Sequence, residues 1–229
     1  MKKRYIPFFL LLSALYSCNN KPTDHFVLRG TIPGATDSTE IVLSPAGKYS
    51  QKIAQGFIVN GKFELQGKVD QPTYCRLSMN DQDILDRSDS QQHSRYMEID
   101  FFVENGELTF QTPHIDSLPE SFWRYDVRKE KNYTLTGSPT QEIFYRYQQQ
   151  TIPSRHGIRQ LEQHLLKDAT PEEYKTLTKT KSELEAQTKE FIRQHHNLPV
   201  NLYLVNQLKK EPFTYDQAYL DELAGFFAS

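Results

Sequence analysis

Residues Phe57 to Leu65 read Phe-Ile-Val-Asn-Gly-Lys-Phe-Glu-Leu, with a β-prone run on each side of Asn60–Gly61. An Asn-Gly pair favours a type I′ turn, which needs a positive φ at both central residues and joins antiparallel strands. Pairing across this turn sets Ile58 opposite Phe63. The stretch therefore predicts a β-hairpin.

A second stretch of the same kind lies at residues 101–110, which read Phe-Phe-Val-Glu-Asn-Gly-Glu-Leu-Thr-Phe. The same register around its Asn-Gly pair sets Val103 opposite Leu108 and Phe101 opposite Phe110. Because alternate residues of a strand point to the same side, we expect these four large side chains to share one face.

Further β-prone runs surround the two hairpins, and Pro-Gly, Ser-Pro and Gln-Pro breaks separate them. The runs cover residues 25–32, 39–44, 72–79 and 131–136 approximately. Many short strands with turn residues between them are typical of sandwiches and barrels. We therefore predict an antiparallel β-sandwich or jelly-roll-like domain over residues 25–136, as the first part of an α+β chain in two parts.

After Gly137 the apolar residues recur at the spacing of a helix, and residues 137–229 are predicted to be all α. Ser138 is suited to cap a helix that has Pro139 at its first position. The apolar stripe of this helix consists of Ile143, Phe144 and Tyr147.

Thr170-Pro171-Glu172-Glu173 is a capping box, which predicts a helix from residue 171 to about residue 196. A narrow apolar stripe recurs along it every seven residues. We expect this stripe to pack antiparallel on an earlier apolar segment and form a helical hairpin; a coiled coil that recruits a partner is the alternative. The two apolar sets are Leu177, Leu184 and Phe191, and Ile158, Leu161 and Leu165.

Two more helices are expected near the end of the chain. Pro199 opens the first, and a second capping box, Thr214-Tyr215-Asp216-Gln217, opens the other. The chain ends at Phe226-Phe227-Ala228-Ser229 without a polar tail or a glycine stop, so we expect that further sequence once followed. The apolar positions are Leu202, Val205 and Leu208, and then Tyr219, Leu220, Leu223, Phe226 and Phe227.

The N-terminus has the pattern of a bacterial lipoprotein export signal. Three cations at residues 2–4 precede an apolar run too short to span a bilayer, and Leu15-Tyr16-Ser17-Cys18 resembles the site where a lipoprotein signal peptidase cuts. We predict a signal peptide over 1–17, a lipid anchor on Cys18 and a linker over 18–24. The expected location is the cell envelope, on the outer membrane facing the periplasm. The alternative is an ordinary secretory signal with an accidental cysteine.

Charge and cysteine content restrict the function. Removal of the signal peptide takes three of the 27 basic residues and leaves 29 acidic ones, so the mature chain is acidic and does not favour a nucleic-acid partner. Besides Cys18 the chain has only Cys75, so it has no internal disulfide partner and no C-x-x-C. One predicted strand face carries Cys75, Leu77 and Met79 at every second position, which indicates that Cys75 is a buried, inert thiol. A reactive or intermolecular thiol is the alternative.

One aromatic group is a candidate ligand site. Phe122, Trp123 and Tyr125 lie beside Arg124 and Arg128 and could stack on a sugar ring or on another protein. The alternative is that these aromatic residues pack the junction between the sandwich and the helices.

No metal, cofactor or catalytic residue is predicted. His195 and His196 are adjacent, so on a helix they point about 100° apart and do not easily share one ion. The acidic stretch from residue 80 to 94 lacks the spacing, the glycine and the closing glutamate of a calcium loop, and is interpreted as a solvated insertion. Its aspartates are Asp81, Asp83, Asp86 and Asp89. No Ser-His-Asp order, phosphate loop, HExxH or paired-carboxylate motif stands out.

Several segments together carry a family resemblance. They are Leu28 to Gly34, Val59 to Gly67, Phe101 to Gly106, Leu135 to Ser138, and His195 to Leu204. With Cys18, they resemble the N-terminal region of Bacteroidota thiol–disulfide oxidoreductase lipoproteins, known as domain of unknown function 4369, and the resemblance extends over residues 18–229. Its members usually continue into a thioredoxin-like domain with C-x-x-C. This chain ends before such a domain, so no catalytic residue is carried over.

Three functions are compatible with these features. The first is a lipid-anchored, non-catalytic binding or positioning module that holds a thioredoxin-like partner in the envelope. The second is the front part of a truncated thiol–disulfide oxidoreductase. The third is an envelope lipoprotein that binds a glycan or a solute, for which the sandwich and the Trp123 group are the motivation.

Overall fold

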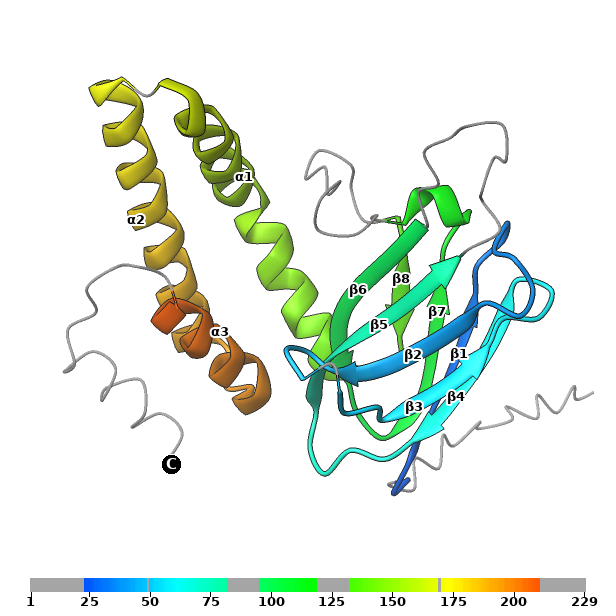
Figure 1. Ribbon diagram of the computed structural model, residues 1–229. Coiled ribbons are helices and arrows are strands. Elements are labelled where there is room, and N and C mark those ends of the chain that lie inside the picture. The colour runs from blue at the N-terminus through cyan, green and yellow to red at the C-terminus, as the bar shows by residue number, and fades with distance from the viewer. Residues whose placement is uncertain (1–22, 49, 82–94, 119–131, 169, 211–229) are drawn as a thin grey trace, which may run out of the picture.

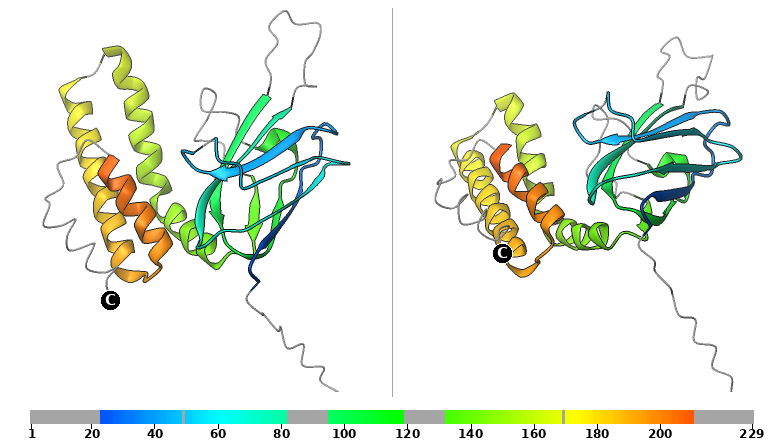
Figure 2. Two further views of the ribbon diagram at one scale, coloured as in Figure 1. Left: turned by 60° about the horizontal axis from the view of Figure 1, so that its bottom comes forward. Right: turned by 90° about the horizontal axis from the view of Figure 1, so that it is seen from below.

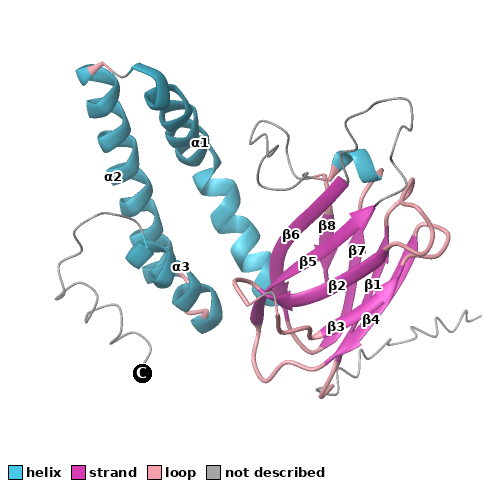
Figure 3. Cartoon of the chain, in the orientation of Figure 1, coloured by secondary structure: helices cyan, strands magenta, loops and turns pink. Residues whose placement is uncertain are grey.

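The computed structural model describes residues 23–48, 50–81, 95–118, 132–168 and 170–210 (Figure 1). The strands come first along the chain and the α-helices follow, as Figure 3 shows by colour. The strands are β1 (Phe26–Thr31), β2 (Glu40–Pro45), β3 (Ala54–Phe57), β4 (Lys62–Gly67), β5 (Thr73–Asp81), β6 (Arg95–Val103), β7 (Gly106–Gln111) and β8 (Thr134–Thr136). A short 3-10 helix spans Ile115–Ser117, and the α-helices are α1 (Pro139–Asp168), α2 (Pro171–Gln194) and α3 (Leu198–Lys210).

The strands form two four-stranded sheets, with strand orders β4-β1-β7-β8 and β3-β2-β5-β6. Neighbouring strands run antiparallel, except that β1 and β7 run parallel. The prediction of an α+β chain with a sandwich before a helical part is therefore confirmed, and the parallel pair is a feature that the sequence reading did not include.

The space between the two sheets is filled by the alternate residues of their strands. On β5, Cys75, Leu77 and Met79 point inward, as predicted, and none is more than 2% exposed. The β6 residues paired with them, Phe101, Ile99 and Met97, are equally buried. Burial of a large apolar side chain contributes roughly 1.5–3 kcal/mol, so this interior holds the sandwich together.

The Asn60–Gly61 turn is confirmed, because both residues have positive φ values, 52° and 66°. Val59 and Lys62 are bonded across it in both directions, at 2.8 and 3.0 Å, and form an isolated β-bridge. Beyond this bridge, the N–H of Ile58 donates to the carbonyl of Thr39 at 3.0 Å, and Phe63 is paired with Gly30. The two arms then belong to different sheets, because β3 pairs with β2 in one sheet and β4 pairs with β1 in the other. The turn therefore joins the two sheets and does not close a hairpin within one of them.

The second hairpin prediction is wrong. Asn105 does not have a positive φ, and β6 and β7 lie in different sheets. The Asn105 side chain instead bonds the backbone of Val69, whose N–H donates to its Oδ1 at 3.1 Å and whose carbonyl accepts from its Nδ2 at 2.9 Å. The four side chains of this prediction do meet, but across the sandwich interior, with the rings of Phe101 and Phe110 6.3 Å apart. They are Phe101, Val103, Leu108 and Phe110, all at most 1% exposed.

The first two helices form the predicted helical hairpin. Ser138 Oγ accepts from the N–H of Gln141 at 3.0 Å at the start of α1, and the Thr170–Glu173 capping box is present at the start of α2. The hydroxyl groups of Tyr147 on α1 and Thr188 on α2 lie 2.9 Å apart and join the two helices. Sequence reading placed the first stripe correctly, since Phe144 and Tyr147 are 1% and 3% exposed.

The helix predicted to open at Pro199 is confirmed as α3, which begins one residue earlier, at Leu198. Of its predicted apolar positions, Val205 and Leu208 are buried, whereas Leu202 is 44% exposed. The buried face of α3 also includes Val200 and Leu204. Helical spacing alone does not show which apolar residues another element covers.

Several predictions concern residues that the structure does not describe. These are the signal peptide with Cys18, the acidic residues Asp83, Asp86 and Asp89, the Trp123 group, and the C-terminal helix from Thr214. In the described part of the chain, no helix combines the length and the apolar character needed to cross a membrane.

Candidate functional site

The helices meet the sandwich at a cluster of aromatic rings on the outer face of β5 and β6. Tyr74 and Phe102 are paired across these strands and point away from the sandwich interior, since their neighbours Cys75 and Phe101 point into it. Phe144 of α1 and Tyr203 of α3 pack against them. We call Tyr74, Phe102, Phe144 and Tyr203 the junction cluster.

The rings of the junction cluster are in direct contact. Tyr74 lies 4.2 Å from Tyr203 and 5.1 Å from Phe102 between ring centroids. Phe144 lies 5.3 Å from both Phe102 and Tyr203, with near-perpendicular rings. Such edge-to-face pairs each contribute about 0.5–1.5 kcal/mol beyond the area they bury. The cluster continues into the interior of the helical part through Tyr147.

Three hydrogen bonds fix the start of α1 on the sandwich. The buried backbone N–H of Phe102 donates to Gln141 Oε1 at 2.8 Å, so the helix satisfies a donor on the free side of β6, which is an edge strand. Glu104, just beyond β6, accepts from Ser138 Oγ at 2.5 Å and from the N–H of Thr140 at 3.0 Å. A carboxylate at a helix N-terminus is favoured by the helix dipole. The direction of α1 is therefore set by groups on the sandwich.

The phenols of the junction cluster are neutral at physiological pH. Burial raises the pKa of Tyr74 well above its ordinary value, and the adjacent Tyr203 adds to this shift. Burial also raises the pKa of Tyr203. Loss of water disfavours the charged form of each phenol, so the cluster is suited to packing and not to proton transfer.

Cys75 lies directly behind this face, with its thiol buried in the sandwich interior. Its side chain is fully buried, and this burial raises the pKa of its thiol to about 12, with the nearby Asp100 carboxylate adding to the shift. Because the thiolate is the nucleophile, a thiol with such a pKa does not attack disulfides near neutral pH. The geometry favours the inert thiol over the reactive alternative.

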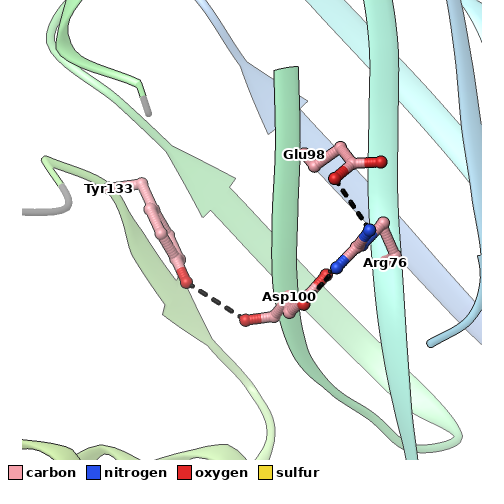
Figure 4. Close-up of polar contacts among 4 residues, drawn as sticks. All are labelled: Arg76, Glu98, Asp100 and Tyr133. Atoms are coloured by element: carbon pink, nitrogen blue, oxygen red, sulfur yellow. Dashed lines mark hydrogen bonds and ion pairs between the residues drawn. The ribbon is translucent and has the colours of Figure 1, made fainter. Parts of the chain in front are cut away.

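A charged network lies further along the same face of β5 and β6 (Figure 4). Arg76 binds Asp100 with two parallel hydrogen bonds, at 2.7 and 2.9 Å, and donates to Glu98 at 2.7 Å. Tyr133, just before β8, donates to the carbonyl of Asp100 at 3.4 Å. The bidentate pair joins the two strands with a fixed geometry. Both carboxylates are engaged by one guanidinium, so the network holds β5 to β6 and is not arranged as an acid–base pair.

Neither feature was predicted from the sequence, although the sequence holds a signal for each. Apolar residues are adjacent at Tyr74–Cys75 and at Phe101–Phe102, and a strand that is apolar at successive positions is covered on both faces. For the network, the alternation of Glu98 and Asp100 on one strand face could have indicated a charged row opposite Arg76.

The structure does not describe the predicted site residues. Phe122, Trp123 and Tyr125 lie outside the described residues, and so does Cys18, so their roles remain predictions. The rings that the structure places at the junction are a different aromatic set.

His195 follows α2, where its ring stacks on Phe191 at 3.9 Å and its Nδ1 lies 3.0 Å from the carbonyl oxygen of Phe191. Among the residues that the structure describes, no group of three or more His, Cys, Asp or Glu side chains is placed to hold a metal ion.

Comparison with known proteins gives one match. The chain matches no curated protein and no solved structure. A family profile covers residues 26–144, from the first residue of β1 to Phe144 of the junction cluster. The matched segment therefore includes the sandwich and the first turns of α1, and extends over slightly more than half of the 229 residues. The chain belongs to the family described as Domain of unknown function (DUF4369).

Proposed function

We propose that this protein is a lipid-anchored module of the cell envelope that binds a thiol–disulfide redox partner. It would position this partner with helices α1 to α3, which we call the helical arm. The observation that carries the proposal is the junction between sandwich and helices. Its aromatic cluster, together with the contacts of Gln141 and Glu104, fixes the direction of α1 relative to the sandwich. A fixed arm is what a positioning module needs, because a flexible one would not define where a partner is held.

The root of the arm lies at the same end of the sandwich as the start of β1. The N–H of Gly106 donates to the carbonyl of His25 at 3.0 Å, and Gly137 lies against the backbone of Glu107. From this end α1 leads away from the sandwich, and α2 returns along it (Figure 2). A helix of 30 residues is about 45 Å long. An anchor on Cys18, a few residues before β1, would therefore place the far end of the arm well away from the membrane surface.

The arm also carries exposed apolar side chains that suit a protein partner. Tyr145 and Ile152 on α1 are 54% and 46% exposed and are seven residues apart, so they lie on one face. Tyr174 in the first turn of α2 is 55% exposed. Aromatic and large apolar residues are enriched at the centres of protein interfaces. Because Cys75 is buried with a raised pKa, the thiol chemistry in this proposal belongs to the partner.

The anchor is tested by the intact mass of the protein extracted from the membranes of its native cell. We expect a chain that begins at Cys18 and carries acyl chains. Cys18→Ser should remove the acyl mass, because it removes the modified sulfur, whereas the control Cys75→Ser should keep it. An unmodified N-terminus in the wild-type protein, or acyl mass retained by Cys18→Ser, would contradict the anchor.

The partner is tested by affinity capture of the full chain from solubilised native envelopes. We expect capture of C-x-x-C proteins, and a loss of at least tenfold in the variant Tyr145→Lys with Ile152→Lys. The matched control is Phe57→Lys with Val59→Lys, which changes two equally exposed residues on the sandwich, 61% and 58% exposed. Reproducible absence of C-x-x-C proteins, or equal loss in both variants, would count against the proposal.

A further inference from the structure

The chain contains two Asn-Gly pairs, and the structure holds them differently. Asn60–Gly61 forms the turn between β3 and β4, whereas Asn105–Gly106 lies where β6 is followed by β7. An asparagine followed by glycine is prone to cyclise, because glycine has no side chain to obstruct the attack of its backbone nitrogen on the asparagine side-chain amide. Since the two pairs contain the same reacting groups, the surroundings of each pair decide how readily it reacts.

Three hydrogen bonds hold the Asn105 pair. Asn105 Nδ2 donates to the carbonyl of Val69 at 2.9 Å, and Asn105 Oδ1 accepts from the N–H of Val69 at 3.1 Å. The N–H of Gly106, which belongs to the nitrogen that would attack, donates to the carbonyl of His25 at 3.0 Å. These bonds must break before the Gly106 nitrogen can attack Asn105 Cγ, so the folded chain disfavours the reactive arrangement.

The reacting groups of the Asn60 pair lack such restraints. Other groups of this turn are bonded, since the N–H of Asn60 donates to Asp37 Oδ1 at 2.6 Å. The carbonyl of Gly61 accepts from the N–H of Ile32 at 2.7 Å. Among the residues that the structure describes, however, the side-chain amide of Asn60 and the N–H of Gly61 have no hydrogen-bond partner. Asn60 is also exposed, so its amide is accessible to water.

We propose that Asn60 is a site of spontaneous deamidation, and that the contacts of the second pair protect Asn105 from the same reaction. The Gly61 nitrogen loses its proton and forms a bond to Asn60 Cγ, the bond from Cγ to Nδ2 breaks, and ammonia leaves. Water then opens the resulting succinimide ring at one of its two carbonyls, which gives aspartate or isoaspartate at position 60. The inference does not depend on the proposed redox partner.

Isoaspartate at position 60 would disturb the connection between the two sheets. It adds a methylene group to the main chain between Val59 and Lys62, which bond each other across the turn at 2.8 and 3.0 Å. The strands on either side of this turn, β3 and β4, belong to different sheets. Either product also places a negative charge close to the carboxylate of Asp37, which bonds the backbone of Asn60. The reaction should therefore loosen this turn.

Peptide mapping by mass spectrometry, after incubation of the full chain at mildly alkaline pH, tests the proposal. In the folded protein we expect Asn60 to deamidate at least about tenfold faster than Asn105, because only the second pair must first break its hydrogen bonds. In guanidinium chloride the two rates should approach each other, because unfolding removes the contacts of Asn105. Equal rates in the folded protein, or the same ratio of rates in the folded and unfolded protein, would overturn the inference.

Hydrogen exchange measures the effect of the reaction on the turn. After the same incubation, the amides of residues 58–63 should exchange faster in the wild-type protein than before it, because the bonds across the turn are lost in the modified molecules. Asn60→Gln is the matched control, since glutamine keeps the amide but would have to close a larger ring and therefore reacts more slowly. Its exchange should not change with incubation. An equal change in both proteins would contradict the assignment of this effect to Asn60.

Discussion

Phe102→Ala is expected to lower the free energy of unfolding by about 3–5 kcal/mol, the range typical of a buried Phe reduced to Ala. Phe102 is 2% exposed and belongs to the sandwich, but its ring contacts lie in both parts of the chain. They are Tyr74 at 5.1 Å, Phe144 at 5.3 Å and Tyr203 at 5.9 Å. The substitution should therefore weaken the attachment of the arm as well as the stability of the chain.

Two controls separate these effects. Phe101→Ala removes the neighbouring ring, which is fully buried but points into the sandwich. It should lower the free energy of unfolding by as much as Phe102→Ala does, but it should not preferentially loosen the arm. Phe57→Ala changes a ring that is 61% exposed and should shift the unfolding free energy by less than about 0.5 kcal/mol. Denaturant unfolding gives the magnitudes, and hydrogen exchange over α1 to α3 reports the arm. A Phe102→Ala variant as stable as Phe57→Ala would show that the junction does not hold the two parts together.

Local features of this fold could be predicted from sequence because they depend on few neighbouring residues. The Asn60–Gly61 turn needs only two residues that tolerate a positive φ, and the Thr170–Glu173 capping box needs only one helical turn. Strand alternation also predicted that Cys75 points inward. In each case the physical cause acts over a few positions of the chain.

Pairing between strands and contact between the two parts required more than local sequence. Asn105–Gly106 resembles the first turn, yet Asn105 bonds Val69, 36 residues earlier, and β7 pairs with β1. The junction cluster brings Tyr74 together with Tyr203, which are more than a hundred positions apart. Residues with the same local spacing can make different distant contacts. The candidate site is such a set of distant contacts, so it was not predicted.

Gly137→Ala is expected to destabilise the chain by about 2–5 kcal/mol, through two costs that add. Gly137 has a φ of +91°, which strains a residue with a Cβ by about 1–2 kcal/mol. A Cβ here would also lie 2.1 Å from the carbonyl oxygen of Glu107, a backbone atom of β7. Because β7 is paired with β1 on one side and with β8 on the other, it cannot move away without disturbing the sheet. Overpacking of this kind costs typically 1–3 kcal/mol more.

Gly47→Ala isolates the first cost. Gly47 has a similar φ of +81°, but an added Cβ would meet no atom within 4 Å. Its substitution should therefore cost only the backbone strain, about 1–2 kcal/mol. Gly137 also immediately precedes Ser138, whose hydroxyl caps α1 and donates to Glu104. A shift of this backbone should loosen the start of the arm, which hydrogen exchange over residues 139–145 would detect. Equal losses of stability in the two variants would mean that β7 yields to the added methyl group, and that the root of the arm is less rigid than the proposed positioning function requires.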